Sequence, residues 1–541
     1  MVVTSISDEP DEQQSWTREF LQSAIVLDDQ AYSVSGAKVG TLEEPPNGPG
    51  RRALSEEARE AVEPKVGHQE RDLDIQGLTD SFADFGIVCG VLCPKTDDSG
   101  AEAARLLRTA SRADIVILDW QIYGDDGKSA FGIISELALA EVSQNALKLI
   151  CVYTADITNI NQIISKIAAG LGKLVSAEHV SKRSDYEIHV GALRIVLYSK
   201  VRLDIPDAEL ASRYAAEAEL PTRLLAEFES MTGGLLQRVA IRALAALRKN
   251  THLLAGRFSP NLDAGYLWHR GALLRPADAE DHIRDILASE FESILDASDA
   301  MDAANGKECE RAIGTLSEPL KDRFKIDRAV VLDDITSLLA PQGELGEVSR
   351  LIRNKLKKAP PVADIAAFAV DVAHAVLANE QFAMIMTLRS RYDEIPRQLH
   401  LGTVLSSNAD GKTRYCICLQ PLCDSARILG ARQFPLLPIS RATNGIFNLV
   451  APVSSEENGH FLVQYNPYLL EMIEFSVRGS ISGPVCANKK EHKWIFTDVA
   501  GREYVWLAEL RTSIAHRIAQ KVSNQFGRIG LDIPEWIREK D

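Results

Sequence analysis

The sequence predicts an α/β protein that begins with a doubly wound parallel sheet and continues with a helical region and a C-terminal α+β domain. Three observations support this prediction. Five short apolar runs alternate with helical patterns up to about residue 205, which is typical of successive strand-helix-strand units. Apolar residues then recur at spacings of three and four up to about residue 400, as they do in amphipathic helices. Beyond residue 401, short strand-like runs return ahead of a final helix.

The N-terminal sheet is predicted from apolar runs at residues 23–27, 86–93, 113–118, 147–153 and 193–198. Runs that are apolar throughout are expected of parallel strands covered by helices on both faces. The helical patterns between them lie at residues 73–85, 100–111, 129–140 and 157–169. We expect residues 1–22 to form an acidic tail and residues 31–70, which are rich in Gly, Pro and charge, to form a flexible insertion. The predicted domain therefore spans residues 23–205.

The rest of the chain is predicted to divide near residue 400. Residues 206–400 form a mainly helical region, with the clearest helical patterns at 224–254, 279–295 and 362–388. Residues 401–541 form the α+β domain, with short strands at 415–420, 445–450, 460–465 and 493–496 and a last helix at 509–526.

Composition agrees with a large globular protein. The chain has 541 residues, of which 45% are hydrophobic and 25% charged, and this mixture excludes wholesale disorder. A formal net charge of −16 disfavours nucleic acid as a partner, because phosphate contacts depend on clustered Lys and Arg. Eight cysteines are too sparse for a disulfide framework, and we find neither a signal peptide nor an apolar run that could span a membrane. We therefore expect a cytoplasmic protein without a membrane partner.

Polar side chains follow four of the predicted strands at the point where each strand ends: Asp28 and Asp29, Asp119, Thr154, and Lys200. The carboxyl ends of parallel strands meet at one edge of a sheet, where open α/β sheets bind their ligands. Three carboxylates at this edge would repel one another unless a hard cation such as Mg²⁺ shares them. Such a site suits phosphoryl transfer, with one aspartate as the nucleophile and with the metal and the lysine balancing the charge.

This order of residues resembles the receiver domain of two-component response regulators. The matching motifs are the Asp28-Asp29 pair, Leu118-Asp119-Trp120, Thr154-Ala155 and Ser199-Lys200, and the resemblance covers about residues 23–202. It implies a flavodoxin-like fold and a response regulator, a phosphoprotein of a two-component phosphorelay.

The resemblance also implies a role for each residue of the motifs. Asp119 would accept a phosphoryl group from a sensor histidine kinase, and Thr154 and Lys200 would contact that group. Asp28, Asp29 and Asp119 would hold Mg²⁺ together with the backbone carbonyl of Gln121. Beyond its own phosphorylation and dephosphorylation, such a domain would not be an enzyme.

The lysine of the site has two candidates. Lys200 lies 46 residues after Thr154, whereas Lys182, at 28 residues, is closer to the spacing of the family. Lys200 is preferred because residues 195–198 read as a buried strand and residues 177–180 do not. Lys182 remains the alternative.

Beyond the receiver, several motifs resemble the response-regulator component of the Detocs anti-phage defence system: Thr232-Gly-Gly-Leu-Leu236, Leu247-Arg-Lys-Asn-Thr-His252, Tyr266-Leu-Trp-His-Arg270, Cys418-Leu-Gln-Pro-Leu-Cys-Asp424 and Arg528-Ile-Gly530. The resemblance implies a role in antiviral defence as a phosphate sink, which drains phosphoryl groups from the partner kinase. It also implies a second receiver, fused to an effector enzyme and encoded in the same operon.

Two other outputs remain open. Phosphorylation could switch the binding of a protein partner to the helical and C-terminal regions, so that the chain acts as a scaffold. The C-terminal domain could instead be an enzyme that uses Cys423 beside Asp424, with His460 or His492 as the base. We find no DNA-recognition helix, no phosphate-binding loop of the Walker type and no kinase signature in the sequence.

Overall fold

The computed structural model describes most of the chain, in residues 11–31, 73–95, 100–144, 147–155, 160–175, 179–201, 211–315, 372–392, 395–409, 411–442, 447–454, 457–477, 482–491 and 493–526. It divides into two compact units, Met1–Ala312 and Ile313–Asp541. The first unit therefore continues well past the domain boundary expected at residue 205. The insertion expected at 31–70 lies, apart from Ala31, outside the described residues.

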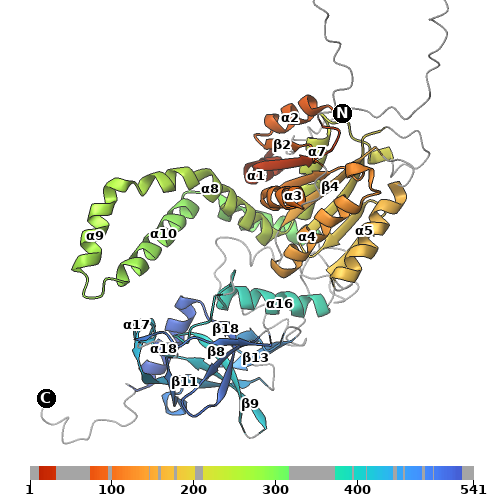
Figure 1. The fold of residues 1–541 in the computed structure, drawn as a ribbon. Coiled ribbons are helices and arrows are strands. Elements are labelled where there is room, and N and C mark those ends of the chain that lie inside the picture. Colours follow the sequence, from red (N-terminus) through yellow and green to blue (C-terminus); the bar gives the residue numbers. More distant parts are fainter. Residues whose placement is uncertain are drawn as a thin grey trace, which may run out of the picture. The chain divides into compact units, whose positions relative to one another are not determined.

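A seven-stranded sheet forms the centre of the first unit, in the order β2-β1-β3-β4-β7-β6-β5 (Figure 1). Its parallel strands are β1 (Ser23–Leu27), β2 (Val88–Leu92), β3 (Ile115–Leu118), β4 (Lys148–Thr154) and β7 (Leu193–Ser199). This order, with helices on both faces, confirms the predicted flavodoxin-like class. All seven residues of β4 and of β7 are buried, as expected of strands inside a doubly covered sheet.

Two further strands extend this sheet beyond the five that the sequence predicts. β5 (Val180–Ser184) and β6 (Glu187–Val190) form an antiparallel hairpin, and β6 pairs with β7. The pattern of apolar runs misses β5 because none of its five residues is buried. Part of the stretch between the predicted helix at 157–169 and the predicted strand at 193–198 therefore covers the edge of β7.

Helices cover the two faces of this sheet. One face packs against α3 (Ala101–Arg112), α4 (Lys128–Gln144) and α5 (Ile160–Leu174). The other face packs against α2 (Ile75–Asp84) and α7 (Leu220–Met231). The two apolar layers together make the sheet a rigid base for the residues at its edge.

The N-terminal segment differs from the acidic tail expected at residues 1–22. Residues Asp11–Phe20 form helix α1, and Trp16, Phe20 and Leu21 belong to the same apolar layer as α2 and α7. Phe20 stacks on Phe228 of α7 with their ring centroids 5.9 Å apart. Trp16 and Phe20 are four residues apart and so lie on one side of the helix, which explains how an acidic segment can still be anchored.

The long helical pattern predicted at 224–254 is two helices. After α7 ends at Met231, the pair Gly233-Gly234 precedes α8 (Leu235–Arg257), because glycine is a poor helix former and favours a break. α9 (Asp263–Ala272), α10 (Asp278–Asp296) and α11 (Gly306–Thr315) follow. Residues 316–371 lie outside the described residues, as does the first part of the helix predicted at 362–388.

The carboxyl end of β7 is paired on both of its sides. The backbone N–H of Lys200, just after the strand, donates to the carbonyl of Thr154 at 2.9 Å. On the other side, the N–H of Ser199 donates to the carbonyl of Arg213 at 2.8 Å, and the N–H of Ala215 donates to the carbonyl of Ser199 at 3.3 Å. A segment that leads into α7 therefore fixes the backbone next to Lys200.

The second unit is built on an antiparallel nine-stranded sheet, which confirms the predicted α+β class. The strands run in the order β12-β13-β11-β9-β8-β18-β17-β16, and β14 pairs with β11. Their bounds are β8 (Thr403–Ala409), β9 (Lys412–Cys418), β11 (Ala431–Arg441), β12 (Leu449–Pro452), β13 (Asn458–Leu462), β14 (Glu471–Ser476), β16 (Asn488–Lys490), β17 (Lys493–Thr497) and β18 (Glu503–Glu509). The described helices of this unit are α16 (Val372–Thr387), α17 (Leu422–Ser425) and α18 (Thr512–Phe526).

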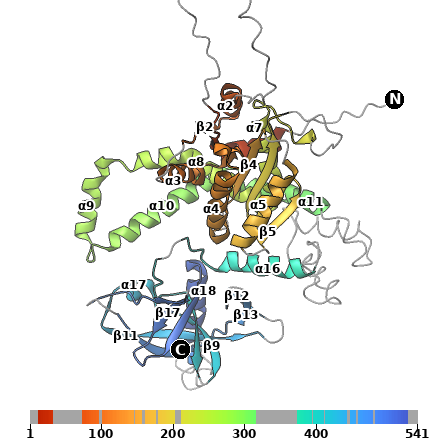
Figure 2. The same ribbon diagram turned by 45° about the vertical axis from the view of Figure 1, so that its right-hand side comes forward.

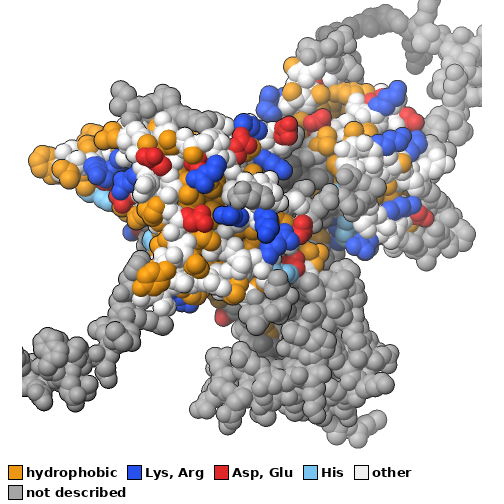
Figure 3. Space-filling model, turned by 90° about the horizontal axis from the view of Figure 1, so that it is seen from below, with side chains coloured by type: hydrophobic (Ala, Val, Ile, Leu, Met, Phe, Trp, Pro, Cys, Tyr) orange, Lys and Arg blue, Asp and Glu red, His pale blue; other side chains and the backbone are white. Residues whose placement is uncertain are grey.

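The surface carries charges of both signs. On the face drawn in Figure 3, basic and acidic side chains are interspersed and do not form separate fields.

Among the described helices, none combines the length and the apolar character that crossing a membrane would require.

Candidate functional site

The five residues predicted from the strand ends lie at one edge of the seven-stranded sheet. Leu27 pairs with Leu118, and Leu118 pairs with Val152, so the residues after β1, β3 and β4 leave the sheet side by side. Thr154 is paired with Ser199, which places Lys200 next to Thr154. The parallel register alone therefore brings the polar side chains together.

Lys200 links two of the carboxylates. Its Nζ donates to Asp28 Oδ2 at 2.6 Å and to Asp119 Oδ2 at 2.5 Å, and all three side chains are buried. Burial by itself lowers the pKa of Lys200, but Asp119 and Asp28 outweigh this and raise that pKa above its usual value. The ammonium group therefore stays charged and offsets the charge of the two carboxylates.

The third carboxylate, Asp29, completes an acidic cluster. One oxygen from each of Asp28, Asp29 and Asp119 can be chosen so that all lie within 4.8 Å of one another. Burial raises the pKa of Asp29, and the charges of Asp119 and Asp28 act in the same direction, whereas a hydrogen bond from the backbone of Tyr123 lowers it. The three carboxylates carry more negative charge than the single ammonium group of Lys200 offsets. Their oxygens, at this spacing, are the kind of ligand that Mg²⁺ prefers.

The loop after Asp119 holds the cluster through its backbone. The N–H of Gln121 donates to Asp119 Oδ1 at 3.0 Å, and the N–H of Tyr123 donates to Asp29 Oδ2 at 2.9 Å. The carbonyl of Gln121, a predicted metal ligand, accepts a hydrogen bond from Gly124 at 2.8 Å. A carbonyl oxygen has a second lone pair, so this bond is compatible with a metal contact.

Tyr123 is a site residue that the sequence analysis missed. It adopts a left-handed backbone with φ of 63°, and its hydroxyl donates to the carbonyl of Lys95 at 2.9 Å. The two glycines of the segment Tyr123-Gly-Asp-Asp-Gly127 were the available signal, because glycine marks tight turns with positive φ.

Position 127 requires glycine because of its backbone conformation and because the Trp120 side chain lies against it. Its φ is +83°, and a Cβ atom there would lie 2.1 Å from ring carbons of the buried Trp120. We expect Gly127→Ala to lower the free energy of unfolding by about 2–5 kcal/mol, because backbone strain adds to the overlap. Gly124→Ala is the matched control: its φ is +60° but the space around it is open, so strain alone should cost about 1–2 kcal/mol. Equal losses in urea denaturation would contradict this account.

The alternative lysine lies elsewhere. Lys182, on the outermost strand β5, donates to Asp185 at 2.7 Å and to Ser165 at 3.1 Å, and its side chain is partly exposed. Of the two candidates, Lys200 contacts the acidic cluster.

Residues 20–204 match the response receiver domain family. No curated protein and no solved structure matches the chain. Receiver domains accept a phosphoryl group on an aspartate, receive it in general from a histidine kinase and bind Mg²⁺ in an acidic pocket. The chain therefore contains a regulatory, phosphoryl-accepting receiver domain, and Asp28, Asp29 and Asp119 form a cluster that could hold the metal.

Mg²⁺ affinity should depend on pH through Asp29. A raised pKa keeps the proton on Asp29 to a higher pH than on an exposed aspartate, and Mg²⁺ competes with that proton. Isothermal titration calorimetry should therefore show affinity falling as the pH is lowered, with the fall beginning at a higher pH than an exposed aspartate would give. In Asp29→Asn, affinity at neutral pH should be about tenfold weaker or more and this pH dependence should flatten.

Asp126→Asn provides the control for the Asp29 variant. Asp126 is an exposed carboxylate of the same receiver and pairs with Lys166 at 3.3 Å. Its substitution should leave Mg²⁺ binding unchanged. Unchanged affinity in Asp29→Asn would instead remove Asp29 from the metal site.

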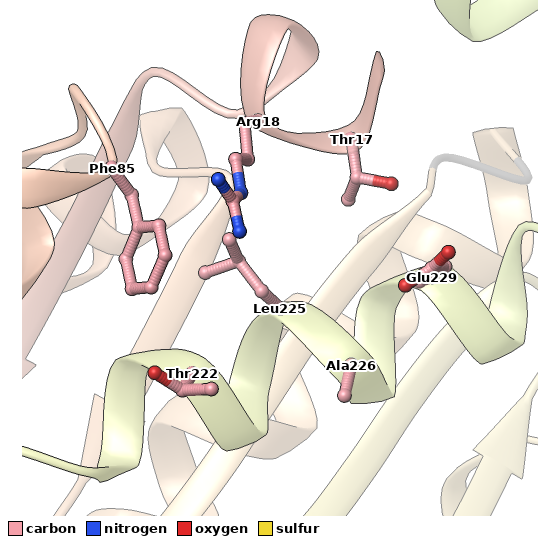
Figure 4. A pocket seen from close by; sticks show the side chains of 7 residues that line it. All are labelled: Thr17, Arg18, Phe85, Thr222, Leu225, Ala226 and Glu229. Atoms are coloured by element: carbon pink, nitrogen blue, oxygen red, sulfur yellow. The ribbon is translucent and has the colours of Figure 1, made fainter. Parts of the chain in front are cut away.

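Two cavities in the described part of the first unit are lined by none of the five predicted site residues. A cavity of about 350 Å³ between α3 and α4 reaches the loop of Tyr123. A smaller one of about 70 Å³ lies between α1 and α7, where Arg18 lies over the ring of Phe85 at 4.9 Å (Figure 4). The five predicted residues therefore form an acidic edge of the sheet outside both cavities, and the larger cavity borders this edge through Tyr123.

In the second unit, Asp424 and His460, the candidate partners of the nucleophile Cys423, pair with other residues. Cys423 is exposed on α17, and Asp424 pairs with Arg432 at 3.5 Å. His460 pairs with Glu380 at 3.0 Å and stacks on Phe447, whereas His492 lies outside the described residues. Burial raises the pKa of the Cys416 and Cys418 thiols, as expected of cysteines that belong to the core.

Proposed function

We propose that this protein is a response regulator whose Asp119 accepts a phosphoryl group from a partner histidine kinase. The observation that carries the proposal is the contact of Lys200 with both Asp28 and Asp119, in an acidic cluster at the carboxyl edge of a receiver sheet. Asp28, Asp29 and Asp119, with the carbonyl of Gln121, would hold Mg²⁺, which neutralises charge on the phosphoryl oxygens when bound.

The transfer needs no separate general base. Asp119 is a carboxylate, and one of its oxygens attacks the phosphorus of the phosphohistidine. The new P–O bond forms as the P–N bond breaks, and the imidazole nitrogen leaves with the bonding electron pair. Lys200, already held beside Asp119, then contacts the phosphoryl oxygens, and the hydroxyl of Thr154 donates to them. Attack of water on phosphorus later releases inorganic phosphate and restores the carboxylate.

The finer role that we propose is that of a phosphate sink in a bacterial anti-phage system. Its support is the resemblance of motifs beyond the receiver to the Detocs regulator, which implies a second receiver-effector protein competing for the same kinase. Loss of phosphate from Asp119 would then be the end of the pathway through this chain. A phosphorylation-switched scaffold is the second candidate, because the helices beyond α7 expose many large apolar side chains.

One experiment tests the transfer and separates the two roles. The full chain is incubated with radiolabelled, phosphorylated partner kinase, in Mg²⁺ or in a chelator, and label is followed on both proteins and in free phosphate. Transfer to the chain in Mg²⁺, and little transfer in chelator, is expected. A sink releases free phosphate over many turnovers, whereas a scaffold retains about one phosphoryl group per chain. Absence of transfer in Mg²⁺ would overturn the proposal.

A further inference from the structure

Helices α8, α9 and α10 form an arm, residues 235–296, that has almost no core of its own. Figures 1 and 2 show α8 and α10 side by side, with α9 at the far end. α9 has no buried residue and α10 has only Ala279, while the buried residues of α8 are Ile241 and Ala245 in its first half. Helices draw most of their stability from packing of an apolar face. The part of the arm that follows Arg248, residues 249–296, is called the outer arm here, and it lacks this main source of stability.

Apolar side chains that could supply such packing lie exposed on the arm. Trp268 is 79% exposed and Ile286 is 46% exposed. The large apolar side chains exposed between residues 253 and 291 are Leu253, Phe258, Leu262, Leu267, Trp268, Leu274, Ile286 and Phe291. Exposed large apolar side chains concentrated in one segment of the chain favour an interaction site, whereas single exposed apolar residues need no explanation.

The two long helices of the arm carry opposite charges. α8 has the five basic residues Arg238, Arg242, Arg248, Lys249 and Arg257 and no acidic residue. α10 has one basic residue, Arg284, and the acidic residues Asp278, Glu280, Asp281, Asp285, Glu290, Glu292 and Asp296. Within the arm, Arg257 pairs with Glu290 at 2.5 Å.

Some of these charges have no partner within the described part of the chain. Lys249 on α8 and Asp285 and Glu292 on α10 form no ion pair there, and Lys249 and Glu292 are exposed. A surface that offers positive charge on one helix and negative charge on its neighbour is complementary to a second copy of itself.

The arm is fixed to the receiver at its base. Arg248 donates to Asp114 at 2.9 Å and to the carbonyl of Phe20, and its guanidinium lies over the Phe20 ring at 4.2 Å. Asp114 precedes β3, so this contact lies at the end of the strand opposite Asp119. The outer arm is therefore held away from the candidate phosphorylation site.

We propose that the arm is a homodimerisation element, in which two copies pack as an antiparallel four-helix bundle. A two-fold axis would place α8 of one copy beside α10 of the other, so that opposite charges flank the apolar side chains of both. α10 has 19 residues and is therefore about 28 Å long, and a face of that length two helices wide approaches the ~800 Å² per partner of stable dimers. The dimer would join two receivers and leave both acidic edges open.

Sedimentation velocity of the full chain over a wide range of concentrations tests the proposal. We expect a dimer whose dissociation constant rises about 100-fold in Ile286→Asp, because the symmetric interface would bury two unpaired carboxylates. Leu174→Asp is the matched control: Leu174, at the end of α5, is 50% exposed and lies outside the arm. This control should shift the dissociation constant less than about threefold, and high salt should weaken the wild-type dimer.

Three results would overturn the proposal. The first is a wild-type chain that stays monomeric at every concentration, and the second is a dimer unaffected by Ile286→Asp. The third is an arm whose amides resist hydrogen exchange equally in monomer and dimer. That result would show that the chain itself covers the arm. Far-UV circular dichroism of each variant establishes that it is folded. Trp268→Asp is a second variant at a site where folding tolerates a polar residue, and it should weaken the dimer as well.

Discussion

The Asp119→Asn variant will take no detectable phosphoryl group from its kinase. The amide lacks the anionic oxygen that attacks phosphorus. The variant should nevertheless fold well. The amide oxygen that replaces the carboxylate can still accept a hydrogen bond from Lys200. Burial is the main cause of the raised pKa of Asp29, and removal of the charge on Asp119 takes away a smaller repulsion that acts in the same direction. Radiolabel transfer and peptide mapping by mass spectrometry measure the loss.

Asp126→Asn is the control for this variant as well, since it removes a carboxylate seven residues later that is exposed and lies in the same loop region. It should accept phosphate at the wild-type rate. Label that persists in Asp119→Asn, on any residue of the chain, would contradict the assignment of Asp119 and redirect attention to the residue that carries it.

The Lys200→Ala variant will lose about 3–5 kcal/mol of unfolding free energy in the absence of divalent cations. The substitution leaves Asp28 and Asp119 buried with no positive charge between them. Because three carboxylate oxygens then share one small space, Mg²⁺ should bind more tightly than in the wild type and recover part of the loss. Urea denaturation with and without Mg²⁺ gives both quantities.

Lys182→Ala distinguishes the two lysines. Its ion pair with Asp185 is partly exposed, and such pairs contribute little, so the expected loss is below about 1 kcal/mol and independent of Mg²⁺. A large Mg²⁺-dependent loss in Lys182→Ala, or none in Lys200→Ala, would show that Lys200 is not the lysine that balances the charge of the cluster.

The acidic edge could be predicted from the sequence because, in a parallel sheet, the order of the strands and the residues at their carboxyl ends are enough to place side chains at one edge. Once the apolar runs are placed, Asp28, Asp119, Thr154 and Lys200 must emerge at the same edge, however long the loops between them are. Spacing along the chain was a weaker guide. The hairpin of β5 and β6 lies between Thr154 and β7, and it accounts for the unusual distance to Lys200.

Features that depend on distant contacts were not predictable in the same way. Helix α1 has an acidic composition, and its place in the core follows from a few residues such as Trp16 and Phe20 that meet α7 and α8. The exposed strand β5 has no apolar pattern to reveal it. The arm reads in sequence as ordinary amphipathic helices, and only the structure shows that its apolar side chains lack a partner within the described part of the first unit.

The double pairing at the end of β7 reduces the entropy that Lys200 loses when a phosphoryl group binds. A free lysine side chain loses about 1.5–2 kcal/mol of rotamer entropy when it is fixed by a ligand. Here the backbone around Lys200 is clamped by Thr154 on one side and by the Arg213 segment on the other, and its Nζ already sits between two carboxylates. Most of that ordering has taken place during folding. An arriving phosphoryl group therefore meets a preorganised cation, and its binding energy can go into stabilising the transferred group.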